Sequence, residues 1–584
     1  MYSTCRETVR IVETEELYTS EANGAVRIRD SYGADFMPVT IPVAWKQIVE
    51  KYPDNPALRF KLGEEWETIT YKGISVCIHP SSSPEACLHI INSSRANIVI
   101  VEDDVQLQKI LKVKDQVPTL KFIIQYASNP TDPLVLNWSE LLDMSVKIRD
   151  DILEKRINDL SVNQCCSIIF TSGTTGSPKA VMRSHDNILF NAKQLMTYLQ
   201  LEVGNESVLS HSHMSDVISQ SSLIDNLKAA KPTCLLMSPG KVEKVNEYIE
   251  TNVLRNGHRF KHELVNRARK AALSHYEDIF ERRFESEFIY KIYKIMVYNW
   301  IKRSVGLDKC KYFMSGGAPL LKSVQQNLMS LDLHVVEAYG LTECGGQALS
   351  AGNDIRVDCH GKALPFTRIK IDKPNENGEG EICLNGRHIF MGYLNDPEKT
   401  REIFDKDGWF HTGDIGTLDS QSYIKITGRI KEVIIIDNGD SIFPASIELK
   451  IRARIPVISH AVLVGESKKF LTLLITLKSE IDAATGMPMD ELKPAAKEWC
   501  QSVGYPCDTV SKILREKPTL IYNAIKQGID EVNSQAFFSD EKIQKFTILP
   551  KDFSLATGEM TRSMKLMRGV VNKKYEDEIN KMYL

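Results

Sequence analysis

The sequence lacks the features that would place it within a membrane or outside the cell. No apolar window of the 584 residues approaches the length of a membrane span, and the opening MYSTCRETVRIVETEELYTSE is too charged for a secretory signal. Twelve cysteines occur without a CxxC pair, and adjacent Cys165 and Cys166 are poorly placed to bridge or chelate. These absences predict a reduced, cytoplasmic chain that meets a membrane, if at all, only at its surface.

An excess of charge of one sign is also missing. The net charge is -3, with 26% charged and 42% hydrophobic residues, which is typical of a soluble globular protein. Nothing in this balance favours a nucleic-acid partner. Tandem repeats and low-complexity segments are absent as well.

The length predicts at least two domains, because 584 residues exceed one ordinary hydrophobic core. A change near residue 427, from glycine-rich strand and turn patterns to a mixed tail, predicts an N-terminal domain at 1–427. The remaining residues, 428–584, are enough to fold as a second domain.

Residues 171–179 read TSGTTGSPK and follow the strand-like residues 167–170. The AVMRSHDNILF that comes next has apolar spacing consistent with a helix, so strand, small-residue loop, Lys179 and helix together predict a phosphate-binding loop. A plain exposed turn is the alternative. The loop is not a P-loop, because its spacing is too short and Ala180 stands where a Ser or Thr is required.

Two further motifs place polar groups at strand ends. SGGAPL (315–320) is a glycine-rich turn after a strand-like KYFM, and YGLTE (339–343) follows the apolar residues 333–338. Ligands of α/β sheets bind at the carboxyl ends of strands, so this placement favours a site there. In GWFHTGDIG, Asp414 lies between glycines, where it would either accept hydrogen bonds from two vicinal hydroxyls or form an Asx-turn.

The order of these motifs carries a resemblance. TSGTTGSPK, YGLTE, GDIG, GRIKE and a late Lys in GEMTRSMKLMR occur in the order seen in the adenylate-forming superfamily of acyl-CoA synthetases, luciferases and peptide-synthetase adenylation domains. Within it, GRHIFMGYLNDPEKT and the C-terminal tail resemble the bubblegum-type long-chain fatty acyl-CoA synthetases. The resemblance runs from about residue 83 to the C-terminus.

The resemblance implies an activity in two steps. ATP and a long-chain fatty acid would form an acyl-adenylate and pyrophosphate, and coenzyme A would then displace AMP. It implies that Thr342 contacts phosphate and that Glu343 ligates Mg²⁺. Lys565 would bridge the fatty-acid carboxylate and the α-phosphate, and Lys431 would be the pivot of a mobile C-terminal domain.

The remaining residues implied by the resemblance bind the nucleotide. The loop would hold the β- and γ-phosphates, Tyr339 would stack on adenine, and Asp414 and Arg429 would reach the ribose. The full implied set is Thr171, Ser172, Gly173, Thr174, Thr175, Gly176, Lys179, Gly317, Tyr339, Asp414 and Arg429.

The resemblance also implies the fold. It is an α/β adenylate-forming fold with a large N-terminal domain of stacked sheets and helices, a small β-barrel-like piece around 355–427, and a mobile C-terminal α+β domain.

The chain departs from the family on the side of the acyl pocket. It is shortened near 72–73, where several dozen residues of βαβ structure would be expected, and again near 214–230. SPGKVEKV (238–245) lacks the tryptophan of the family's aromatic gate. Three hypotheses follow. The chain is an active synthetase with a reshaped acyl tunnel, or a paralogue or splice form that binds nucleotide or lipid without turnover. The third, an adenylating enzyme for another carboxylate, is disfavoured because the C-terminal tail resembles that of fatty acyl-CoA synthetases.

One segment, 288–306, resembles a membrane-surface helix. In FIYKIYKIMVYNWIKRSVG, aromatic and aliphatic residues alternate with lysines at helical spacing. We favour a core-facing helix with lysines that reach solvent over an interfacial helix. Peripheral association with the endoplasmic reticulum or other membranes stays open, without a transmembrane segment.

Overall fold

The structure is a computed structural model of the chain. It describes residues 10–30, 35–51, 56–62, 65–70, 82–145, 149–171, 179–202, 206–209, 220–254, 259–281, 287–349, 356–437, 441–482, 485–536, 542–561 and 565–584.

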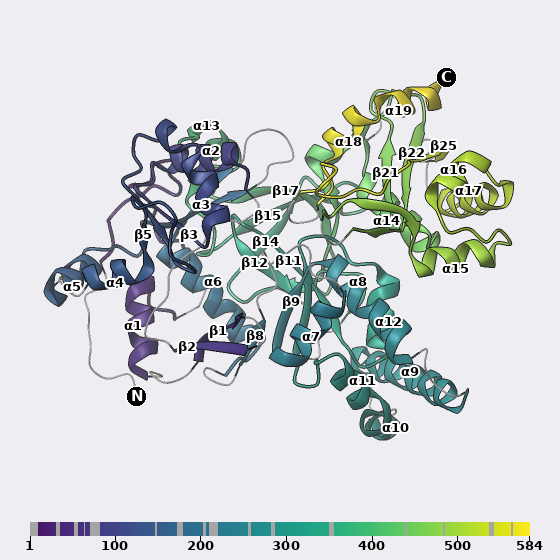
Figure 1. Cartoon of the computed structure of the whole chain (residues 1–584), viewed down its shortest axis with the longest axis horizontal. Helices are drawn as coiled ribbons and strands as arrows, with labels where there is room; N and C mark the ends of the chain where they lie inside the picture. The colour runs from purple at the N-terminus through teal and green to yellow at the C-terminus, as the bar shows by residue number, and fades with distance from the viewer. Residues whose placement is uncertain are drawn as a thin grey trace.

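A six-stranded sheet forms the centre of the N-terminal part, in the order β13-β12-β11-β10-β9-β8 (Figure 1). Its strands are β8 (Val208–Leu209), β9 (Cys234–Met237), β10 (Tyr312–Gly316), β11 (Val335–Leu341), β12 (Gly345–Leu349) and β13 (Lys362–Ala363). Strands β8 to β11 run parallel, whereas β12 and β13 are antiparallel. The carboxyl ends of β10 and β11 therefore meet at one edge, which is where two of the motifs begin.

Helices cover this sheet and share one apolar core with it. They are α7 (Gln220–Ala230), α8 (Pro239–Tyr248), the π-helix η2 (Ile249–Leu254), α9 (Arg259–Phe280), α10 (Glu287–Tyr293), the π-helix η3 (Lys294–Tyr298), α11 (Asn299–Ser304) and α12 (Lys322–Met329). The core includes Leu235, Phe313 and Val335 from the strands, which fits the near-continuous apolar runs of buried parallel strands.

Two antiparallel sheets lie beside the central one. The first has the order β16-β7-β6 and contains β6 (Cys165–Thr171), β7 (Lys179–Ser184) and β16 (Gly392–Tyr393), with α6 (His185–Tyr198) after β7. The second contains β14 (Arg368–Asp372), β15 (Gly380–Asn385), β17 (Phe410–Leu418) and β18 (Ile424–Arg429), with α13 (Pro397–Glu402) between β16 and β17.

The second sheet corrects one detail of the expected fold. Its order is β14-β15-β17-β18, and in the described residues the outer strands β14 and β18 do not pair with each other. The region around 355–427 is thus an open antiparallel sheet and not β-barrel-like. The α/β class with a smaller C-terminal α+β part is confirmed.

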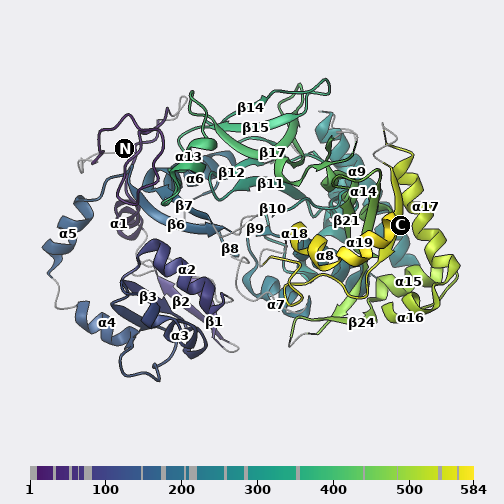
Figure 2. The same cartoon turned by 90° about the horizontal axis from the view of Figure 1, so that it is seen from above.

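The N-terminal region contains a small parallel sheet, β3-β4-β5, that is set apart from β14–β18 (Figure 2). Its elements are β3 (Ile98–Val101), β4 (Phe122–Gln125) and β5 (Leu136–Asn137), with α2 (Pro84–Ser94), α3 (Asp104–Leu111), η1 (Lys114–Gln116), α4 (Trp138–Ser145) and α5 (Asp150–Asn158). Before it come α1 (Ile41–Lys51) and the hairpin β1 (Pro56–Leu62) and β2 (Glu65–Thr70). The predicted shortening at 72–73 lies outside the described residues, as does 214–219 of the second.

The C-terminal part, drawn in yellow-green in Figure 1, has its own sheet and core. The sheet order is β21-β22-β25, with β21 (Ile458–Val464), β22 (Leu471–Leu477) and β25 (Ile543–Ile548). The other elements are η4 (Ile430–Glu432), β19 (Ile434–Ile435), β20 (Ser441–Ile442), α14 (Pro444–Arg454), β23 (Ser479–Ile481), β24 (Pro488–Leu492), α15 (Pro494–Ser502), α16 (Val510–Glu516), α17 (Thr519–Asn533), α18 (Arg568–Lys574) and α19 (Glu576–Tyr583).

An ion pair joins this part to the N-terminal part. Arg452 of α14 lies 3.5 Å from Glu243 of α8, and both side chains are partly exposed. The domain boundary at 427/428 stays a prediction, although β18 ends close to it.

The 288–306 segment is helical, but the prediction that it faces the core is only half right. Tyr290, Val297, Tyr298 and Ile301 are buried, whereas several of the other large apolar side chains are exposed. None of the described helices has the length and apolarity needed to cross a bilayer.

Candidate functional site

The YGLTE turn lies at the edge where β10 and β11 end side by side. Gly316, the last residue of β10, pairs with Ala338 of β11. A Cβ on Gly340 would lie 2.3 Å from the carbonyl oxygen of Gly345, so only glycine fits where β11 turns into β12. Gly317 has φ +91 in the neighbouring turn, which again favours glycine. This edge is therefore built around closely approaching backbones.

Tyr339 connects this edge to the antiparallel sheet. Its hydroxyl donates a 2.9 Å hydrogen bond to Oδ2 of Asp414, and Nε of Arg429 lies 2.8 Å from Oδ1. Asp414 and Arg429 are opposite each other in the β17–β18 register. Burial raises the pKa of Asp414, and the Arg429 charge opposes that rise. Each carboxylate oxygen has a second lone pair, so Asp414 retains capacity for ligand hydroxyls.

A second chain of contacts runs from Glu343 to Lys179. Tyr393 of β16 donates a 2.9 Å hydrogen bond to Oε1 of Glu343, and Nζ of Lys179 lies 3.5 Å from the Tyr393 hydroxyl. The Lys179 ammonium also lies 4.6 Å from the centre of the Tyr393 ring. Burial and the positive charge of Lys431 lower the pKa of Lys179, whereas Glu343 raises it. Lys179, Glu343 and Lys431 thus occupy one electrostatic neighbourhood.

Lys565 reaches the same place from the C-terminal part. The segment turns back on itself at Lys565, because Thr561 N donates to the Lys565 carbonyl at 2.7 Å and Lys565 N donates to Thr561 Oγ1 at 3.0 Å. Lys565 is exposed, yet the surrounding protein and the Arg429 charge lower its pKa, and Asp414 opposes them. Lys565 is therefore close enough to Asp414 and Arg429 for their charges to act on its pKa.

The predicted hinge residue, Lys431, lies in the short helix η4 directly after β18. This helix connects the Asp414–Arg429 strand pair to the C-terminal part, and Lys431 itself is exposed. The position is the end of one element and the start of the next, where a backbone change disturbs few contacts.

The predicted phosphate loop lies mostly outside the described residues, which begin again at Lys179. Of the implied set, Ser172, Gly173, Thr174, Thr175 and Gly176 fall there. Thr171 and Lys179 pair directly across β6 and β7, so the ends of the loop meet. The expected helix after the loop is half right: residues 179–184 form strand β7 instead, and helix α6 begins at His185 behind a Ser184 capping box.

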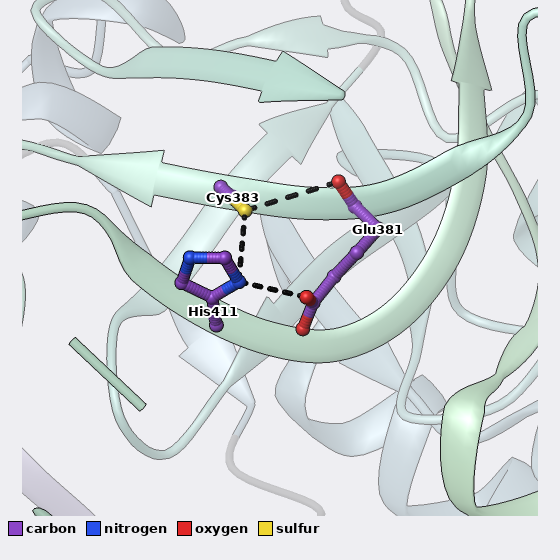
Figure 3. A group of neighbouring side chains, drawn as sticks. All are labelled: Glu381, Cys383 and His411. Atoms are coloured by element: carbon purple, nitrogen blue, oxygen red, sulfur yellow. Dashed lines mark hydrogen bonds and ion pairs between the residues drawn. The ribbon is translucent and has the colours of Figure 1, made fainter. Parts of the chain in front are cut away.

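Three side chains that sequence reasoning missed lie together on β15 and β17: Glu381, Cys383 and His411 (Figure 3). Glu381 accepts from Gly413 N at 2.9 Å through Oε1, and Nδ1 of His411 lies 2.7 Å from Oε2. Metal ligands at about 2.1 Å from a tetrahedral zinc ion would stand about 3.3 Å apart. The shorter distance identifies a hydrogen-bonded cluster, and burial raises the pKa of the Cys383 thiol to about 12. The cluster fixes the loop before Asp414.

Glu337 holds the glycine-rich turn 315–320 at the end of β10. Its Oε2 accepts from Leu320 N at 3.0 Å and lies 3.7 Å from Nε2 of His360. Burial raises the pKa of Glu337 to about 7 and lowers the pKa of His360 to about 4. A charged residue within the apolar run 333–338 was the available signal for this role. Tyr393 had no such signal, because its contact depends on pairing between β16 and β7.

The geometry brings together Tyr339, Glu343, Asp414, Arg429 and Lys565 from three distant stretches of chain. Comparison with known proteins agrees with this assembly. The sequence model of the AMP-binding enzyme family matches residues 68–394, more than half of the chain, and that of the AMP-binding enzyme C-terminal domain matches residues 431–521. The chain belongs to the AMP-binding enzyme family.

Its relatives place it more finely within that family. Long-chain-fatty-acid–CoA ligase ACSBG2 of Xenopus laevis is 34% identical over 644 aligned positions, which cover 97% of this chain and 87% of that protein. The human protein of the same name is 33% identical, and the alignment covers 98% of this chain and 96% of the human protein. This AMP-binding enzyme is thus bubblegum-type. Because 644 positions exceed the 584 residues of the chain, at least 60 positions of the Xenopus relative face gaps.

Solved structures agree on the fold. The adenylation domain of a carboxylate reductase from Mycobacterium chelonae has a TM-score of 0.62 at 14% identity, covering 95% of this chain and 93% of its own. ATP-bound MatB from Rhodopseudomonas palustris has a TM-score of 0.55 at 18% identity, covering 85% and 83%. Both support the arrangement of an AMP-binding enzyme with two parts.

Proposed function

We propose that this AMP-binding enzyme activates long-chain fatty acids to acyl-CoA through an acyl-adenylate. ATP, the fatty acid and coenzyme A are its substrates, and AMP, pyrophosphate and acyl-CoA are its products. The observation that supports the proposal most is the ion pair between buried Asp414 and Arg429, whose two charges act on the Lys565 ammonium of the C-terminal part. The names of the relatives supply the substrate class.

The nucleotide-binding roles follow from the contacts. Asp414, held by Tyr339 and Arg429, would accept hydrogen bonds from the ribose hydroxyls. Tyr339 would present its ring to the adenine, and the turn at Gly317 would leave room for the nucleotide beside it. Thr171 and Lys179 at the ends of the loop would place positive charge and donors at the β- and γ-phosphates.

Mg²⁺ fits the residues present. Glu343 offers a carboxylate and Thr342 a hydroxyl at the same turn, and Mg²⁺ is usually bound by one or two carboxylates together with substrate phosphates. When bound, it would neutralise phosphate charge. Tyr393, by donating to Glu343, would hold that carboxylate in place.

In the first step a carboxylate oxygen of the fatty acid attacks the α-phosphorus of ATP. The new P–O bond forms as the bond to the β-phosphate oxygen breaks, and pyrophosphate leaves with its electron pair. Two anions must approach each other, so cations aimed at the α-phosphate lower the barrier. Lys565 would bridge the carboxylate and that phosphate.

In the second step the coenzyme A thiolate attacks the acyl carbonyl carbon, and the bond to the AMP oxygen breaks. A rotation about Lys431 would withdraw Lys565 and admit the thiol. The C-terminal part would in this way serve each step in turn.

Pyrophosphate release by the purified chain tests the proposal. The assay supplies Mg²⁺-ATP and fatty acids of increasing length, with and without coenzyme A. Fatty-acid-dependent release is expected, and Lys565→Ala should lower it about a hundredfold or more, because it removes a transition-state charge. Lys526→Ala, at an exposed lysine of α17, is the matched control. If folded wild-type protein releases no pyrophosphate, the proposed activation of fatty acids is refuted.

A second candidate function is a form that binds nucleotide without turnover. The observation in its favour is the deficit of at least 60 positions against the Xenopus relative. An ATP-dependent rise in melting temperature without pyrophosphate release would establish it. We also propose a cytoplasmic location with peripheral access to membranes, because the fatty acid partitions there.

A further inference from the structure

The helical segment α10–η3–α11 exposes a continuous set of large apolar side chains. We call it the outer face, and it consists of Phe288, Ile289, Ile292, Ile295, Met296 and Trp300. Phe288 is 76% exposed and Ile295 is 77% exposed, which is close to complete for such residues. Contiguous apolar patches of this kind mark interaction sites on soluble proteins. Figure 1 places α10 and α11 at the lower edge of the molecule, where a flat partner could approach.

The opposite face of the same segment is fixed by polar contacts. Tyr290 OH donates to Oδ1 of Asp332 at 2.7 Å, and Lys302 Nζ donates to Oδ2 at 2.6 Å. Tyr298, which is fully buried, donates to the Ala268 carbonyl at 2.6 Å. Rotating the helix to bury the outer face would break these buried hydrogen bonds. The exposure is therefore built into the packing of the segment.

The charges around the outer face have one predominant sign. Between 287 and 304 the exposed charges are three basic residues and Glu287, which lies 2.7 Å from Lys291, whereas Lys302 pairs with Asp332 on the opposite face. Lys291, Lys294 and Arg303 are exposed. The centres of protein interfaces are depleted in lysine. Aromatic and aliphatic residues mixed with lysine are the composition of helices that lie in the plane of a lipid surface.

We propose that the outer face docks on the surface of an anionic lipid bilayer. Phe288, Ile295 and their neighbours enter the boundary between headgroups and acyl chains, while Lys291 and Lys294 extend to the lipid phosphates. Docking needs no turnover, so it goes beyond the proposed activity and stands if that activity fails. It would bring the enzyme to the phase in which its substrate is dissolved.

Flotation with lipid vesicles tests the apolar contribution. Full-length wild type should float with vesicles of phosphatidylcholine and phosphatidylserine, and the double variant Phe288→Asp/Ile295→Asp should bind at least about tenfold more weakly. Leu134→Asp is the matched control, because Leu134 is 76% exposed on another part of the surface. Unchanged melting temperatures would exclude unfolding as the cause, since the altered side chains are exposed.

A second flotation experiment tests the contribution of the Lys291 and Lys294 charges. Lys291→Glu/Lys294→Glu should weaken binding to the mixed vesicles by about fivefold or more for each lysine, with little effect on phosphatidylcholine alone. Lys526→Glu, at an exposed lysine of α17, should bind as wild type. Failure of wild type to float would overturn the proposal, and so would wild-type binding by the apolar variant. A wild-type dimer that the apolar variant converts to monomer would assign the face to a second copy instead.

Discussion

The antiparallel sheet that contains Asp414 and the small sheet β3-β4-β5 differ in how far they expose apolar side chains. In β15, Ile382, Cys383 and Leu384 are fully buried. In the small sheet, by contrast, Phe122 is 50% exposed, and Leu134, which precedes β5, is 76% exposed. Both sheets bury inner residues, since Val99 and Ile123 of the small sheet are 1% and 4% exposed. Phe122 and Leu134 lie in the N-terminal region, where the sequence predicts that the chain is shortened. The comparison teaches that apolar side chains are covered better in the sheet that contains Asp414 than in the small sheet of the N-terminal region.

The largest expected effect concerns the antiparallel sheet that contains Asp414. Asp414→Asn should lower kcat/KM for ATP in pyrophosphate release by about a hundredfold to a thousandfold, because Arg429 loses its partner and the ribose loses an anionic acceptor. Asp419→Asn, which removes a partly exposed partner of Arg356 in the same sheet, should change it far less. Equal losses in both variants would show that any damage to the sheet has this effect.

Next comes the pH dependence of stability at Glu337. Its pKa is raised to about 7 in the folded state, so the stability it contributes is full below the unfolded value near 4.5 and is lost as the pH rises through 7. Glu337→Gln should therefore exceed wild type by about 3 kcal/mol in unfolding free energy at pH 8 and equal it at pH 4.

Denaturant unfolding of both chains across that range measures the difference. His360, Asp358 and Lys425 face Glu337 in both chains, so their own titrations cancel to first order. Parallel curves for the two chains would contradict the assignment.

A smaller effect is expected from the cluster in Figure 3. Glu381→Gln keeps one acceptor but loses the other, so the loop that carries Asp414 should loosen. KM for ATP should rise about tenfold with a lesser change in kcat, as for a residue that positions a binding group. Glu376→Gln, in the exposed turn before β15, provides the control. A fall in kcat alone would argue against positioning.

The smallest effect belongs to the small sheet. Phe122→Ser and Leu134→Ser should leave the melting temperature nearly unchanged, within about 0.5 kcal/mol in free energy, because exposed side chains gain little from folding. Both should reduce aggregation on heating. A large destabilisation would mean that these side chains are covered in solution, and the contrast between the two sheets would then disappear.

Motif order predicted more than local pattern did. The family, the α/β fold and the neighbourhood of Tyr339, Asp414, Arg429 and Lys565 were available from five motifs in sequence. The strand at 179–184 was not, because a short apolar run fits a strand or a helix equally well. Glu381 and Tyr393 depend on the register between strands far apart in the chain, which a single sequence does not contain. Their roles, like those of the predicted site residues, rest on the tests above.

The 3.5 Å pair between Arg452 and Glu243 has a consequence for timing. Partly exposed ion pairs contribute about 0–1 kcal/mol, which is close to thermal energy. An ion pair of that strength breaks and re-forms spontaneously many times during one catalytic cycle. The bound substrate, and not this ion pair, would then determine how long Lys565 remains near Asp414 and Arg429.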